Sequence, residues 1–69
     1  MVHKANQIAL FFESYSYEEA VKGVGDHLLK FWEPRMRRQI VAYVEGGGAG
    51  LRPSVVDAVR GLPAVPATQ

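Results

Sequence analysis

The 69-residue chain contains no cysteine, so it cannot carry out any chemistry that needs a thiol. It has no disulfide to stabilise a small fold, no thiolate for an iron–sulfur cluster and no cysteine nucleophile. The absence of cysteine fits a reducing compartment, and we expect a cytoplasmic protein.

Histidine and long apolar runs are also scarce. His3 and His27 stand far apart, with no carboxylate at ligand spacing on a shared helix face, so no metal site is expected. The apolar run Ile8–Phe12 is far too short to cross a bilayer, so no membrane is expected among the partners. The serines cluster where helices are predicted to start, and no nucleophile and base can be paired. These absences indicate a binding protein, not an enzyme.

Hydrophobic periodicity predicts an all-α fold, a small bundle of about four short helices. The helices are expected at about residues 2–13, 17–30, 34–45 and 53–61, within one domain over residues 1–62. Residues 63–69 show no periodicity and are predicted to form a flexible, disordered tail. A domain this small, without a cross-link, is expected to gain stability from a partner protein.

Apolar side chains spaced three and four residues apart define the expected core. They are Val2, Ala5, Ile8, Ala9 and Phe12 in the first helix, Tyr17, Ala20, Val21, Val24, Leu28 and Phe31 in the second, Met36, Ile40, Tyr43 and Val44 in the third, and Val55, Ala58, Val59 and Leu62 in the fourth.

Local signals predict where the helices begin and end. Ser16 and Glu19 fit a capping box, and Pro34 and Pro53 suit first helical positions. The glycine run 46–48 should end the third helix, with its first glycine in the left-handed region. No strand precedes this run and no Gly-Lys-Ser/Thr follows it, so it is not a phosphate-binding loop. Glycines 23 and 25, inside the second helix, suggest close approach of a neighbouring helix.

Charge is distributed unevenly. The net charge is +1, but residues 1–33 carry three Lys against five Asp/Glu, whereas residues 34–52 carry four Arg against one Glu. Arg35, Arg37 and Arg38 crowd the first turn of the third helix, where the partial positive charge of the helix end disfavours cations. The arginines form a solvated face, with local pairing to Glu33, or they pair with carboxylates of another subunit. Nucleic-acid binding ranks third, because three charges make a small phosphate footprint.

Apolar residues outside the core stripes suggest a docking surface. Trp32 is expected in the core between two helices, and beside the arginines it also suits an interface anchor. Leu29 and Val41 are candidates for the same surface, together with Leu10 and Val56. The alternative is that these residues are scattered or complete the core.

Several segments resemble the delta subunit of cytosolic NAD-dependent formate dehydrogenases, and the likeness spans about residues 6–62. The segments are Ala5-Asn6-Gln7-Ile8-Ala9, Glu18-Glu19-Ala20, His27-Leu28, Phe31-Trp32, Pro34-Arg35-Met36-Arg37-Arg38-Gln39 and Val44-Glu45-Gly47-Gly48-Gly50-Leu51. Two positions depart from the family pattern: Glu33 stands where aspartate is usual, and Arg52 where a serine-like cap is common.

The resemblance implies a small non-catalytic subunit of a complex that oxidises formate to CO₂ and reduces NAD⁺. It implies a molybdenum or tungsten pterin cofactor, iron–sulfur clusters and FMN in the other subunits, and no cofactor bound by this chain. The implied partner is the catalytic alpha subunit within a larger hetero-oligomer, and the implied role is assembly, or insertion and retention of the molybdenum cofactor. The alternatives are a transient maturation chaperone and, third, a small nucleic-acid-binding helical protein.

Overall fold

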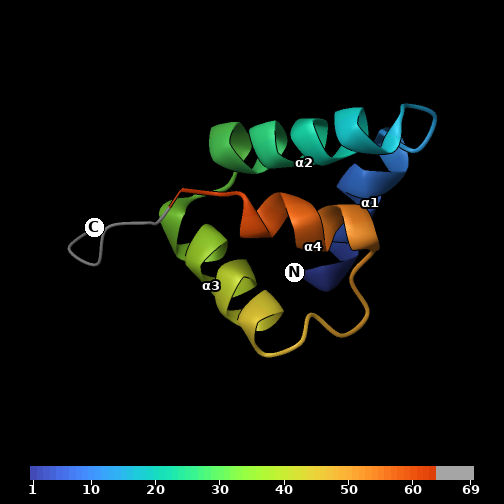
Figure 1. Ribbon diagram of the computed structural model, residues 1–69. Coiled ribbons are helices and arrows are strands. Elements are labelled where there is room, and N and C mark those ends of the chain that lie inside the picture. Colours follow the sequence, from blue (N-terminus) through green and yellow to red (C-terminus); the bar gives the residue numbers. More distant parts are fainter. Residues whose placement is uncertain (64–69) are drawn as a thin grey trace.

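The computed structural model describes residues 1–63, and in that range it contains four helices and no strand (Figure 1). The helices are α1 (Val2–Phe11), α2 (Tyr17–Phe31), α3 (Pro34–Glu45) and α4 (Pro53–Arg60). The all-α prediction is confirmed. The predicted tail lies outside the described residues from residue 64 onward. No described helix is both long enough and apolar enough to cross a membrane.

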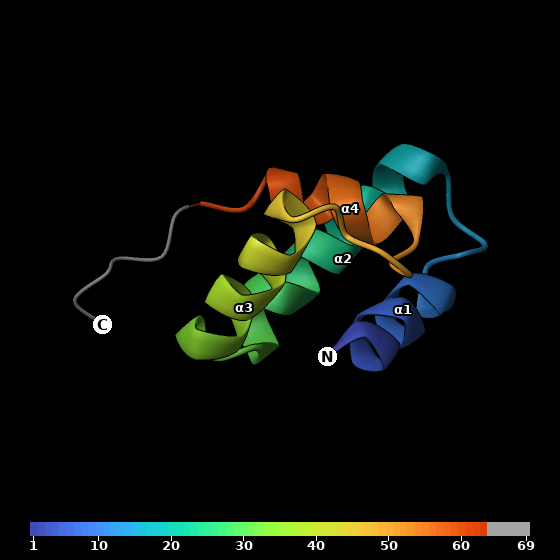
Figure 2. The same ribbon diagram turned by 90° about the horizontal axis from the view of Figure 1, so that it is seen from below.

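Helix α4 occupies the centre of the bundle although it has only eight residues. It contacts all three of the other helices, and Figure 1 shows it between α2 and α3. Seen from below in Figure 2, α1 and α3 extend to the same side of α4, one at each of its ends. The core is therefore built around the buried face of α4. The core cluster consists of Ala5, Ala9, Val24, Leu28, Trp32, Ile40, Val44, Val55, Ala58 and Val59.

Two residues predicted for the core face of α2 are exposed, and those predictions are wrong. Tyr17 is 52% exposed and Phe31 is 71% exposed. They are the first and last residues of a 15-residue helix, about 22 Å long. Helix α4, its main neighbour, has eight residues and is about 12 Å long. The Phe31 end of α2 therefore extends beyond α4. Tyr17 lies beside α4 instead, at its solvent-exposed edge, where its hydroxyl donates to the Asp57 carboxylate.

Helix α1 ends at Phe11, two residues earlier than predicted. The N–H of Phe12 donates to the carbonyl of Ala9, and that of Glu13 to the carbonyl of Leu10. These bonds span three residues instead of four, so the chain tightens into a turn beyond the α-helix. The turn places the Phe12 ring against Gly23 of α2, where an added Cβ would lie 2.5 Å from Cε1 of the ring. The close approach predicted at Gly23 is therefore made by the ring of the residue that follows α1, whereas at Gly25 an added Cβ would lie 3.9 Å from the Ala58 methyl group of α4.

The predicted capping box at the start of α2 is confirmed. The Glu19 backbone N–H donates to Ser16 Oγ at 3.2 Å, and the Ser16 N–H donates to Glu19 Oε1 at 3.4 Å. Pro34 and Pro53 begin α3 and α4 as predicted, but neither Glu33 nor Arg52 caps its helix with its side chain.

The end of α3 differs from the prediction in one respect. Gly46 has φ −84°, while Gly47 and Gly48 have positive φ. The N–H of Gly48 donates to the carbonyl of Tyr43, and the N–H of Gly47 to that of Val44, the hydrogen-bond pattern of a Schellman motif. The left-handed residues therefore lie one and two positions later than expected, because the first glycine still forms part of the helical turn.

Candidate partner-binding site

Arg37 joins the end of α2 to the start of α3. Its Nη1 donates to the carbonyl of Leu29 at 3.0 Å and to the carbonyl of Trp32 at 3.2 Å. The last carbonyls of a helix have no partner within the helix, and their partial negative charge attracts a cation. Arg37 is half-buried and supplies both the donor and the charge. Its position in the first turn of α3 is thus accounted for by the neighbouring end of α2.

Trp32 lies in the core, with 8% of its surface exposed. It forms the C-cap of α2 in an extended conformation, and its N–H still donates to the carbonyl of Leu28. The extended backbone at Trp32 turns the chain from α2 toward α3. The core position predicted for Trp32 is therefore the observed one. Trp32 also lines a surface hollow together with Lys4, Ile8 and Phe31.

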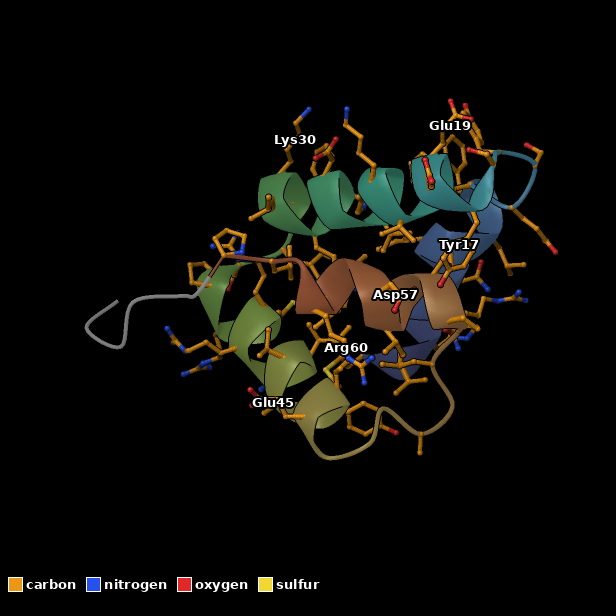
Figure 3. All side chains as sticks on the ribbon, in the orientation of Figure 1. Tyr17, Glu19, Lys30, Glu45, Asp57 and Arg60 are labelled. Carbon is orange, nitrogen blue, oxygen red and sulfur yellow. The ribbon has the colours of Figure 1, made fainter. Side chains whose placement is uncertain are left out.

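Arg35 and Arg38 are exposed on α3. Arg38 lines a hollow of about 490 Å³ between α3 and α4, together with Val41, Arg60 and Leu62. Arg60 comes from α4, and Glu45 borders the same hollow (Figure 3). The lining of the hollow thus combines apolar side chains with two guanidinium groups and one carboxylate. It suits an apolar side chain flanked by an acidic group.

Leu29 lies at a different but neighbouring position. It is 41% exposed and lines a hollow of about 210 Å³ between α2 and α4. Leu62 borders both this hollow and the one that contains Arg38 and Val41. The structure therefore places Arg38 and Val41 together and Leu29 next to them, whereas Trp32 borders a hollow formed by α1 and α2.

The four apolar residues outside the predicted stripes divide into two pairs. Val41 and Val56 are partly buried and pack against the core. Leu10 and Leu29 are 40% and 41% exposed.

Among residues 1–63, the most exposed large apolar side chains are two that were not predicted from the sequence to bind a partner. Phe11 is 73% exposed and Phe31 is 71% exposed. They border two adjoining hollows of about 370 and 320 Å³, which share Gln7, Ile8 and His27. The adjacent pair Phe11-Phe12 could have indicated an exposed ring. The side chains of adjacent helical residues point in directions about 100° apart and cannot both face the same core.

The start of α2 contains a titratable group with a shifted pKa. The pKa of Tyr17 is raised, first by its hydrogen bond to the Asp57 carboxylate and then by desolvation and the charge of Asp57. Among residues 1–63, no group of three or more His, Cys, Asp or Glu side chains is arranged to hold a metal ion. What the site offers chemically is therefore apolar contact and arginine hydrogen bonding.

Comparison with known proteins identifies one family. Residues 1–59 match the family model described as NADH-dependent formate dehydrogenase delta subunit FdsD. No curated protein and no solved structure gives a significant match.

Proposed function

This chain belongs to the family of formate dehydrogenase delta subunits, and from that membership we propose that it is a non-catalytic accessory subunit which docks on the catalytic alpha subunit. In that role it supports assembly of the complex, or insertion and retention of the molybdenum cofactor. The observation that carries the proposal is the family match over nearly the whole described chain, in a protein whose surface presents hollows lined by arginine and apolar side chains.

The proposal assigns the redox centres to other subunits. Iron–sulfur clusters are held by cysteine thiolates, and this chain has no cysteine to offer. The molybdenum or tungsten pterin cofactor and the FMN are likewise assigned to the larger chains. The proposal places the complex in the cytoplasm. The residues of this chain bind and orient a protein, and no reaction step is assigned to them.

The hollow between α3 and α4 is the proposed binding site for the alpha subunit. Arg38 and Val41 line this hollow, and Leu29 lines the neighbouring hollow that shares Leu62 with it. The planar guanidinium group pairs with carboxylates through two parallel hydrogen bonds, which gives direction as well as attraction. Arg35, exposed one turn earlier on α3, extends this basic edge. Arg37 contributes by fixing the angle between α2 and α3, and Trp32 by supporting both helices from the core.

Co-purification with a tagged alpha subunit tests the proposal. We expect Arg38→Ala to weaken the complex by about 2–5 kcal/mol if its guanidinium forms a buried ion pair there, because the partner carboxylate is left unpaired. Lys30→Ala is the matched control, since Lys30 is an exposed cation on the outer side of α2 (Figure 3). If the wild-type chain fails to associate with the alpha subunit, the docking proposal is wrong.

Stoichiometry separates a permanent subunit from a transient chaperone. We expect the chain to co-purify with the active enzyme in equal amount to the alpha subunit. A chain that binds only the cofactor-free alpha subunit and leaves the loaded enzyme would instead be a maturation factor.

A further inference from the structure

Helices α1 and α2 present an aromatic face that the fold does not use. We define it by Ile8, Phe11, His27 and Phe31, which line the two adjoining hollows described above. Almost three-quarters of each phenylalanine is exposed to solvent, whereas Phe12 and Leu28, on the same segments, pack in or against the core. Contiguous exposed apolar surface of this kind is typical of protein–protein interaction sites.

The rings of this face are held in place by their neighbours. The ring centroids of His27 and Phe31 lie 4.7 Å apart, and those of Phe11 and Phe12 lie 5.0 Å apart in a T-shaped arrangement. Phe12 is itself seated against Gly23 of α2. Binding therefore costs little ordering of these side chains, which is a property of interface anchors.

We propose that the aromatic face is a second docking surface, covered in the assembled enzyme by apolar side chains of a larger formate dehydrogenase subunit whose flanking carboxylate meets Lys4. This inference rests on the proposed function, because only a chain that is a subunit has such a partner. It adds an interface distinct from the hollow between α3 and α4.

Charge selects this occupant over a second copy of the chain. Among the residues that line the two hollows, Lys4 carries the one formal charge and no acidic residue is present. A symmetric dimer apposes the same patch on both subunits, so it would offer Lys4 no carboxylate. A larger subunit with an acidic residue beside an apolar patch can cover the rings and pair with the Lys4 ammonium group.

A cysteine-labelling experiment tests whether the aromatic face is covered in the complex, and each variant replaces a single residue of that face. Because the natural chain has no cysteine, the thiol introduced by Phe31→Cys or by Phe11→Cys is unique within it. We expect rapid maleimide labelling of the free chain and at least tenfold slower labelling of the chain within the complete complex. Leu10→Cys is the control, because Leu10 is an exposed apolar residue of α1 that borders neither hollow. Its labelling rate should be the same in both states.

Affinity measurements complete the test. Phe11→Ser with Phe31→Ser should weaken binding to the remaining subunits about tenfold or more, as expected for interface aromatics, and Leu10→Ser should not. Lys4→Glu should weaken it by repelling the partner carboxylate. Circular dichroism of each variant should show wild-type helicity, and if the double variant unfolds, the labelling rates alone decide.

The outcomes are distinct. Equal labelling of Phe31→Cys in the free and assembled states, with normal assembly, overturns the aromatic-face inference and leaves the proposed function standing. A free chain that dimerises through this face, while complex formation ignores the serine variants, also overturns it. If the wild-type chain never joins the complex, the proposed function fails and this inference fails with it.

Discussion

The Phe12 ring occupies the space in which a side chain at residue 23 would begin. A Cβ at Gly23 would lie 2.5 Å from Phe12 Cε1, while a Cβ at Gly25 would lie 3.9 Å from the Ala58 methyl group, an ordinary contact. The same helix therefore contains one glycine required by packing and one that is not, and this contrast can be measured.

We expect Gly23→Ala to destabilise the protein and Gly25→Ala to stabilise it. Alanine in place of helical glycine contributes about 0.5–1 kcal/mol, and at Gly25 nothing opposes this gain. At Gly23 the Phe12 ring must be displaced, and overpacking of this kind costs about 1–3 kcal/mol, which exceeds the gain. Urea denaturation of the two variants measures the difference. Combining Gly23→Ala with Phe12→Leu should restore part of the loss, and a loss unchanged by Phe12→Leu would contradict the steric explanation.

Asn6 connects α1 to the start of α4 across 44 to 46 residues of sequence. Its Nδ2 donates to the carbonyl of Gly50 at 2.9 Å, and its Oδ1 accepts from the N–H of Arg52 at 3.0 Å. Arg52 is the N-cap residue of α4 and gives that helix no side-chain cap. Asn6 thus holds the chain in the place where it enters the central helix.

Asn6→Ala should lower the free energy of unfolding by about 1–2 kcal/mol, because two backbone groups lose their partners. Asn6→Asp is the control: the carboxylate still accepts from the Arg52 N–H but cannot donate to Gly50, so it should lose less. Thermal melts followed by circular dichroism rank the three proteins. Equal losses in both variants would show that the Arg52 bond contributes nothing.

The features that the sequence predicted correctly are those fixed by residues close together in the chain. Ser16 and Glu19 are three residues apart, and the two proline starts depend on the proline itself, so these elements were predictable. Phe31 was misplaced because periodicity records the face of a residue on a helix and not the length of the neighbour that covers it. Tyr17 was misplaced because its hydroxyl bonds to the exposed Asp57 of α4, a partner that periodicity does not reveal.

The functional surfaces were harder to predict for the same reason. Arg37 was expected to be available to a partner, but its donors face carbonyls five and eight residues earlier, across a bend that no local pattern specifies. The role of Asn6 depends on residues more than forty positions away. The aromatic face arises from the packing angle of α1 and α2, and periodicity of either helix alone does not give this angle.

Arg37 and Arg35 are expected to differ sharply when replaced by alanine. Arg37→Ala removes the donors to Leu29 and Trp32 at the end of α2 and should cost about 1–2 kcal/mol of stability. Arg35→Ala removes an exposed cation from the unfavourable end of α3 and should change stability by less than about 0.5 kcal/mol. Chemical denaturation of the isolated chain measures both. A stable Arg37→Ala protein would mean that the observed hydrogen bonds do not hold the bend.

Tyr17 and Asp57 join the start of α2 to α4, and their hydrogen bond makes the fold sensitive to alkaline pH (Figure 3). The pKa of Tyr17 is raised above its usual value of 10.0, chiefly by this bond. A pKa that is higher in the folded state means that the folded protein holds the proton more tightly than the unfolded chain. The stabilisation is therefore fully present below about pH 10 and is lost as the pH rises through the folded-state pKa.

Tyr17→Phe should be less stable than wild type at pH 7, and the difference should shrink above pH 10 because wild type loses the same contribution. Denaturation curves of both proteins between pH 7 and pH 11 measure it, and a difference that stays constant across this range would rule out the tyrosine proton as its source.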